Sequence, residues 1–318
     1  GVFMCRLLSS LLIFLLPLLS PLQSLAEESP TVHLEDYSDR VEAERLLKAA
    51  KGLSGPRRLL FFSKYFLGRK YRPETKKRVK EQRSSKGKVE AKNEHPLPVE
   101  SLKTSFEYLD CMTYVEHVLA LSATEGLEYE DFLQRLIDVM FHAKGEPLMN
   151  HLRNHFTSRW ARVNEEKAYL KNLARGHPLA KTREVLLNRV GENRTFFIAD
   201  RFMIFAEEEI IHYFPKDVIL EGKLALKSGD LLAMLARREG LDVLHMGFYV
   251  EEKLQAKPML RHASYSKNRI LDQDFEQYLK RNDYFDGLLV FRPQFEPDKA
   301  EDYEIKLLSG KGKKKERL

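Results

Sequence analysis

The chain has 318 residues, of which 43% are hydrophobic, and a formal net charge of +6 at pH 7. This length and apolar content are those of a globular protein with one large domain or two small ones. The chain holds two cysteines, Cys5 and Cys111, and the first lies in a predicted leader, which excludes an intramolecular disulfide in the mature protein. The positive charge suits an anionic surface but does not choose among acidic polymers, membranes and nucleic acid.

The first 26 residues have the pattern of a secretory signal peptide. Arg6 precedes an apolar run over residues 7–19, and Ser24-Leu25-Ala26 is a small-x-small cleavage site. The alternative is a retained membrane anchor, which the shortness of the apolar run disfavours. We therefore predict an exported protein of the periplasm or cell envelope, without stable membrane insertion.

Two helical segments and a basic segment follow the leader. Residues 27–55 predict an N-terminal helical extension, and residues 59–68 a helix that ends at a glycine. Residues 72–103 are basic and poor in large apolar side chains, so they form either an exposed insertion or an arm that grips an acidic polymer. A second basic segment, at residues 294–318, closes the chain as a tail.

A lone cysteine opens the next predicted helix. Asp110 is placed to cap this helix through its first backbone N–H groups, and Cys111 occupies the first helical position. The helix dipole at that position favours a thiolate over a thiol. The alternative is a buried structural cysteine, since free cysteine is among the most buried residue types.

The segment after the next predicted helix, at residues 129–141, contains two histidines and the one tryptophan. His151 and His155 have the i, i+4 spacing of half a zinc site, but no HExxH pattern and no cysteine pair completes it. We predict no metal. The bland interpretation is a polar segment in which Trp160 is a packing anchor.

The second half of the chain changes from helical to strand-like patterns. Residues 165–190 are polar and are predicted to be mostly helical, and residues 195–205 are a strand or a short helix. Strands are then predicted at 229–235, 243–250, 258–264 and 287–292, the middle two joined as a hairpin. Helices first and strands second predict an α+β fold with a helical N-terminal half packed on an antiparallel sheet.

The predicted strand at 243–250 has two faces. Leu244 and Met246 share an apolar face that should pack on the core, whereas His245 and Gly247 point to the other side. His262, on the next strand, is expected opposite or diagonal to His245. A thiol, a histidine base and a polar group that orients the base are the components of Cys–His catalysis.

Four motifs resemble, in order, the papain-like NlpC-type cell-wall hydrolases. They are Leu109-Asp110-Cys111, Gly229-Asp230-Leu231, His245-Met246-Gly247 and His262-Ala263-Ser264. The resemblance implies a papain-like domain over residues 56–293, with Cys111 as nucleophile, His245 as base and His262 as its orienter. It also implies that Tyr71, of Leu67-Gly68-Arg69-Lys70-Tyr71, contacts the substrate or its oxyanion; Lys70 stands where the family often has proline.

The run from Asp110 to Glu116, and Arg153-Asn154-His155-Phe156 before Trp160, resemble the N-acetylmuramoyl-L-alanine amidase-like branch. This implies hydrolysis, through an acyl-enzyme and without a cofactor, of the amide between the muramoyl lactyl group and L-alanine in peptidoglycan or muropeptides. We expect Tyr71, Asp110, Arg153 and Trp160 to contact the substrate. Arg153 or Arg159 would bind a stem-peptide carboxylate, or would form a structural ion pair.

Two alternatives remain open from the sequence. The same fold could cut within the stem peptide, at the γ-D-glutamyl bond. The chain could instead be a non-catalytic envelope-binding module whose basic arm holds an acidic polymer. A nucleic-acid partner is not expected, because the leader exports the chain and the basic run lacks interleaved aromatic residues.

Overall fold

A computed structural model describes residues 31–34, 39–73, 104–142, 153–189, 206–252, 256–295 and 304–307. Several predicted segments lie outside these residues: the signal peptide at 1–26, nearly all of the basic insertion at 72–103, His151, the segment at 195–205 and most of the tail at 294–318.

The N-terminal half of the described chain is helical, as predicted. Its helices are α1 (Arg40–Ala49), α2 (Gly55–Tyr65), α4 (Cys111–Ala123), α5 (Tyr129–Met140) and α6 (Thr157–Glu166). Gly68 ends the α2 segment in the left-handed region, at φ +85°, which glycine adopts without strain. Helix α4 is buried on all sides from Tyr114 to Ala123, so it forms the centre of the helical half.

A large, mostly antiparallel sheet forms the second half, which confirms the predicted α+β class. Its strands run in the order β3 (Tyr108–Leu109), β2 (Lys70–Tyr71), β10 (Arg269–Asp274), β9 (Met259–Ser264), β8 (Val243–Val250), β7 (Leu231–Ala236), β11 (Phe285–Pro293), β6 (Glu207–Pro215) and β5 (Lys181–Leu187), with β4 (Leu170–Asn172) paired to β11. Strands β2 and β3 pair in parallel, and β8 and β9 form the predicted hairpin. A separate parallel pair joins β1 (Thr31–Leu34) to β12 (Glu304–Leu307).

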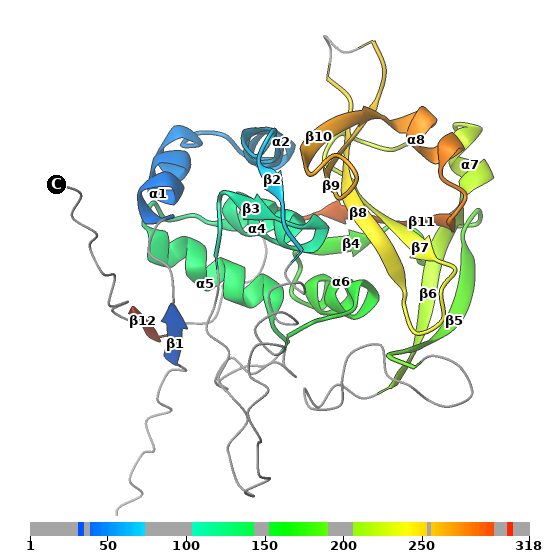
Figure 1. Ribbon diagram of the computed structural model, residues 1–318, viewed down its shortest axis with the longest axis horizontal. Helices are drawn as coiled ribbons and strands as arrows, with labels where there is room; N and C mark the ends of the chain where they lie inside the picture. The colour runs from blue at the N-terminus through cyan, green and yellow to red at the C-terminus, as the bar shows by residue number, and fades with distance from the viewer. Residues whose placement is uncertain are drawn as a thin grey trace, which may run out of the picture.

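Helices cover both faces of the sheet, so neither face is fully open to solvent. The larger core cluster packs α1, α2, α4 and α5 against one face, and a second cluster lies on the other face, beneath α7 (Lys216–Leu220) and α8 (Phe275–Arg281). Figure 1 shows the two groups of helices on opposite sides of the sheet. Among the described helices, none is long and apolar enough to cross a lipid bilayer.

The predicted helix over residues 165–190 is wrong. This segment holds β4 and β5, and β5 pairs along its full length with β6. Strand β5 is an edge strand whose first residues, Lys181, Thr182 and Glu184 among them, are polar and exposed, so no apolar alternation marks that part of it in the sequence. Pairing with β6, and not local propensity, determines its conformation.

Candidate active site

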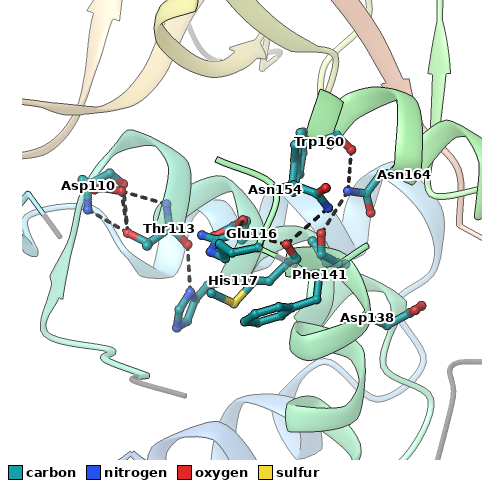
Figure 2. A network of polar contacts seen from close by, with 12 residues as sticks. Asp110, Thr113, Glu116, His117, Asp138, Phe141, Asn154, Trp160 and Asn164 are labelled. Carbon is teal, nitrogen blue, oxygen red and sulfur yellow. Dashed lines mark hydrogen bonds and ion pairs between the residues drawn. The ribbon is translucent and has the colours of Figure 1, made fainter. Parts of the chain in front are cut away.

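The start of α4 is held by a reciprocal cap. The backbone N–H of Thr113 donates to Asp110 Oδ1 at 2.9 Å, and the backbone N–H of Asp110 donates to Thr113 Oγ1 at 2.9 Å. Figure 2 shows these two residues bonded to each other, with His117 one turn further along the helix. The predicted capping role of Asp110 is confirmed, and the cap fixes Cys111 at the first position of the helix.

Cys111 is half-buried between the helical half and β8. Burial, together with the negative charge of Asp110, raises the pKa of its thiol to about 12. Backbone N–H groups of Met246, Met112 and Cys111 itself act in the opposite direction. The helix dipole was expected to favour a thiolate; here desolvation outweighs it, and the resting group is a neutral thiol. The Met246 contact places the sulfur beside the peptide that joins His245 to Met246.

Strand β8 carries a bulge directly before His245. Met234 pairs with His245 and Leu235 with Val243, so Leu244 is an extra residue on β8. Leu244 was expected on the core face and is instead 36% exposed, whereas Met246 lies in the core beside α4. The bulge is the physical reason for the difference, and it turns His245 toward the face covered by α8.

Gly247 makes room for the second histidine. A Cβ at this position would lie 2.7 Å from the Cβ of His262 and 2.7 Å from the carbonyl oxygen of Arg261. Strands β8 and β9 therefore approach closely only because residue 247 has no side chain. The expected diagonal placement of His262 relative to His245 is confirmed.

A short hydrogen-bond chain joins His245, His262 and Gln273. His245 Nε2 lies 2.6 Å from His262 Nδ1, and His262 Nε2 lies 2.6 Å from Gln273 Oε1. An amide oxygen only accepts, so His262 Nε2 carries a proton and His262 Nδ1 accepts from His245 Nε2–H. His245 Nδ1 is then the nitrogen left as a base.

Both rings are neutral at ordinary pH. Burial, together with the nearby His262, lowers the pKa of His245 to about 3. Burial also lowers the pKa of His262 to about 4, although the hydrogen bond to Gln273 and the charge of Asp272 act against it. A neutral thiol and a neutral imidazole therefore lie in the same region of the fold.

A pocket of about 620 Å³ opens on the α8 side of these histidines. Its walls include His245, His262 and Gln273 from the sheet, and Tyr278 and Arg281 from α8. The ring centroid of Tyr278 lies 5.3 Å from that of His262 and 6.3 Å from that of His245. The charge on Cys111 also raises the pKa of Tyr278, after burial and the Tyr284 hydroxyl, so thiol, imidazoles and phenol are electrostatic neighbours.

Tyr71 lies near Cys111, close enough for their charges to interact. Strand β2 pairs Tyr71 with Leu109, two residues before the cysteine. Burial, followed by the charges of Cys111 and Asp110, raises the pKa of Tyr71, so its hydroxyl keeps its proton and can donate. Its ring packs edge-on against that of Tyr265, with centroids 5.6 Å apart. The resemblance-based placement of Tyr71 near the cysteine therefore has a structural basis in the β2–β3 pair.

Two residues expected to contact substrate are buried elsewhere. Arg153 is 6% exposed and forms a fork-like pair with Glu116, with Nη2 2.7 Å from Oε2, and it also donates to the carbonyl oxygen of Met140. Trp160 is 0% exposed, within the larger core cluster. Figure 2 shows the polar network between α4, α5 and α6 in which Glu116, Asn154 and Trp160 lie. Arg153 therefore forms a structural ion pair, and Trp160 is a packing anchor of the core; neither is placed to contact a substrate.

Three pocket residues were missed as site residues from the sequence. Gln273 lies on β10, a polar strand that the patterns did not predict, and Tyr278 and Arg281 lie on the short helix α8. A possible signal was the grouping of Gln277, Tyr278 and Arg281 at helical spacing after the strand region.

No group of three or more metal-ligating side chains is found in the parts of the chain that the structure describes. His155, one of the two histidines with zinc-like spacing, is half-buried there, and His151 lies outside those parts.

Comparisons with known proteins agree with the fold. A protein from Legionella pneumophila strain Philadelphia 1 is 18% identical, with a TM-score of 0.61 over 85% of this chain and 98% of that chain. An N-acetylmuramoyl-L-alanine amidase from Bacteroides uniformis is 21% identical, with a TM-score of 0.55 over 75% and 98%. A putative xylanase from Bacteroides fragilis is 21% identical, with a TM-score of 0.52 over 73% and 98%. At these identities the likeness shows the fold alone.

The sequence comparisons are more specific. No curated protein matches the sequence. A family model described as AmiA-like, N-acetylmuramoyl-L-alanine amidase-like, matches residues 61–288, which contain every histidine, tyrosine and cysteine of the site above. Because this match covers well over half of the chain, the protein belongs to the N-acetylmuramoyl-L-alanine amidase-like family.

Proposed function

We propose that the protein is a cysteine-dependent amidase of the papain-like NlpC type. Its substrate is peptidoglycan or a muropeptide, and the bond cleaved joins the muramoyl lactyl group to L-alanine. The observation that carries this proposal is the hydrogen-bond chain from Gln273 through His262 to His245, the residue directly before Met246, whose backbone N–H bonds to the Cys111 sulfur. Family membership supports the amidase chemistry and the wall-derived substrate.

The first step is attack by Cys111 on the amide carbonyl carbon. His245 Nδ1 accepts the thiol proton as the S–C bond forms, and the imidazolium is stabilised through His262 and Gln273. A neutral thiol and a neutral imidazole suit this step. Burial disfavours a single charge on either group, whereas the proton transfer creates two opposite charges at once, and these stabilise each other. Proton transfer therefore accompanies the attack.

The oxyanion that forms on the carbonyl needs hydrogen-bond donors at the start of α4. The backbone N–H groups at the helix N-terminus and the protonated hydroxyl of Tyr71 are suitable donors. His245 then gives its proton to the leaving amine of L-alanine as the C–N bond breaks. A water molecule hydrolyses the resulting thioester by the same base, which releases the muramic acid carboxylate and restores the thiol.

Export is part of the proposal. Residues 1–26 have a signal-peptide pattern, and a peptidoglycan substrate lies outside the cytoplasm. After removal of that leader Cys111 is the one thiol of the chain, so alkylation of the mature protein reports on this residue alone.

The decisive experiment is hydrolysis of purified muropeptides by the wild type and by Cys111→Ala. We expect kcat to fall by at least about a thousandfold, because the nucleophile is lost and no neighbouring thiol replaces it. Met112→Leu, a change of the next residue in the same helix turn, is the matched control and should retain activity. Iodoacetamide should inactivate the wild type, and a chelator should not. Undiminished hydrolysis by Cys111→Ala would remove the cysteine mechanism.

Mass spectrometry of the products identifies the bond. Free sugar and an intact stem peptide mark the amidase. A shortened peptide still attached to the sugar marks the stem-peptide endopeptidase and would overturn the proposed bond. Binding to wall material without any product would mark the non-catalytic module.

A further inference from the structure

The pocket beside His245 and His262 contains a cation that the proposed chemistry does not use. Among the described residues that line it, Arg281 is the one with a permanent positive charge. The two histidines in the wall are kept neutral by burial. The pocket is therefore positive on its α8 side, and the source of that charge is the last residue of α8.

The one carboxylate in the pocket wall is already bound by other groups. Asp274 accepts from the backbone N–H of Gln277 at 2.8 Å and lies 3.4 Å from Lys257 Nζ. These contacts lower the pKa of Asp274, and Arg281 contributes to it only through its charge. Within the described residues, no carboxylate lies within ion-pair distance of Arg281. Arg281 thus lines a pocket of about 620 Å³ without a direct ion pair, and the one carboxylate in the wall is held by Gln277 and Lys257.

Tyrosines form the rim of the same pocket. Tyr265 is 66% exposed and Tyr284 is 44% exposed, although both are large and partly apolar. The Tyr284 hydroxyl lies 2.9 Å from that of Tyr278, which contacts both histidine rings. Exposed aromatic rims around a few convergent polar groups are typical of ligand sites. This rim offers flat aromatic surfaces to a sugar or peptide, and the exposed Arg281 offers a cation in the same pocket wall.

The other arginines considered for such a role are engaged elsewhere. Arg153 is buried against Glu116, and Arg159 lies 3.4 Å from Glu207 on β6. We propose that Arg281 binds a carboxylate of the stem peptide and so orients the substrate against His245 and Cys111. This inference rests on the proposed function and names a specificity-determining residue for it. A guanidinium grips a carboxylate with two parallel hydrogen bonds, which neutral amides do not reproduce.

The test crosses two enzymes with two substrates. The substrates are a muramoyl dipeptide with free carboxylates and the same compound with those carboxylates amidated. We expect Arg281→Gln to raise KM for the free acid roughly 10- to 100-fold and to leave KM for the amide unchanged, because only the acid loses a charge-assisted hydrogen bond. Arg281→Lys should recover part of the effect. Lys280→Gln is the matched control, since Lys280 pairs with Glu276 along the surface of α8 and does not line the pocket.

Each result decides the inference. Equal losses on acid and amide would show a structural role for Arg281, and no loss on either would show no role; both overturn it. Melting temperatures of the variants identify any failure to fold, and Arg281→Lys keeps the test valid in that case. If the wild type hydrolyses neither compound, the proposed function fails, and calorimetric binding to the wild type still tests Arg281. Tighter binding of the acid than of the amide, lost in Arg281→Gln, supports the inference; equal binding overturns it.

Discussion

Two polar clusters lie on different sides of the Cys111 helix, and they behave differently. The interior cluster, Glu116 and Arg153, pairs two opposite charges in a fork with atoms 2.7 Å apart and is closed to solvent. The pocket cluster, His245, His262 and Gln273, is a chain of neutral groups with two contacts of 2.6 Å that opens on a pocket. The interior cluster satisfies its charges within the protein. The pocket cluster ends at His245 Nδ1, whose lone pair can accept a proton.

The comparison shows that a residue in a family motif can stabilise the fold without taking part in the reaction. Arg153 belongs to a stretch that resembles the amidase branch, yet its guanidinium binds Glu116 and the carbonyl oxygen of Met140. A buried guanidinium that is already paired with a carboxylate cannot also bind a carboxylate of the substrate. Gln273 belongs to none of the recognised motifs and still determines which nitrogen of His245 is basic.

The largest effect on stability is expected from breaking the interior cluster. Arg153→Met leaves the Glu116 carboxylate buried without its partner, so we expect the free energy of unfolding to fall by about 3–5 kcal/mol. Urea denaturation measures it. Arg159→Met is the matched control, because its partner Glu207 is partly exposed and such pairs contribute about 1 kcal/mol or less. An Arg153→Met protein as stable as the wild type would contradict a structural role for this pair.

The pocket cluster should make stability depend on pH. Unfolded histidine titrates at an ordinary pKa of 6.5, whereas His245 and His262 in the fold have pKa values lowered to about 3 and about 4. Between these values the unfolded chain binds protons that the folded chain does not. Stability is therefore complete above pH 6.5 and declines as the pH falls, by about 2 kcal/mol per histidine at pH 5.

Urea denaturation at pH 7 and pH 5 measures this decline. The double variant His245→Asn, His262→Asn should lose less stability than the wild type over that interval, because its pocket has no histidine to protonate. His212→Asn, on β6 away from the pocket, is the control and should behave as the wild type. Equal pH dependence in all three proteins would contradict the buried, neutral state of the pair.

The sequence predicts the parts of this site that lie on strongly patterned elements. Val243–Val250 alternates, and the structure places β8 over the same residues. Cys111 follows a capping aspartate, and α4 begins there. These features are local, because a cap and an alternating strand are encoded by neighbouring residues. The hairpin then brings His262 next to His245 without further information.

The remaining parts depend on contacts between distant residues. Glu116 is 37 positions from Arg153, and nothing in either neighbourhood indicates that they pair. Strand β10 is polar and is recognised only through its pairing with β9, so Gln273 could not be placed beside His262 in advance. The bulge at Leu244 follows from the register of β7 and β8, which the sequence of β8 alone does not contain.

The smallest effect, and the most specific, is expected at Gln273. Gln273→Leu removes the acceptor for His262 Nε2–H, so neither histidine is held in one tautomer and we expect kcat to fall roughly 10- to 100-fold with little change in KM. Gln273→Glu keeps an acceptor and should retain activity, while its negative charge raises the pKa of His262 and moves the acidic limb of the kcat profile to higher pH. Gln294→Leu, after β11 and away from the pocket, is the control. A Gln273→Leu enzyme with the wild-type kcat and pH profile would show that His245 is oriented without this chain, and the difference between the two clusters would then rest on access to the pocket alone.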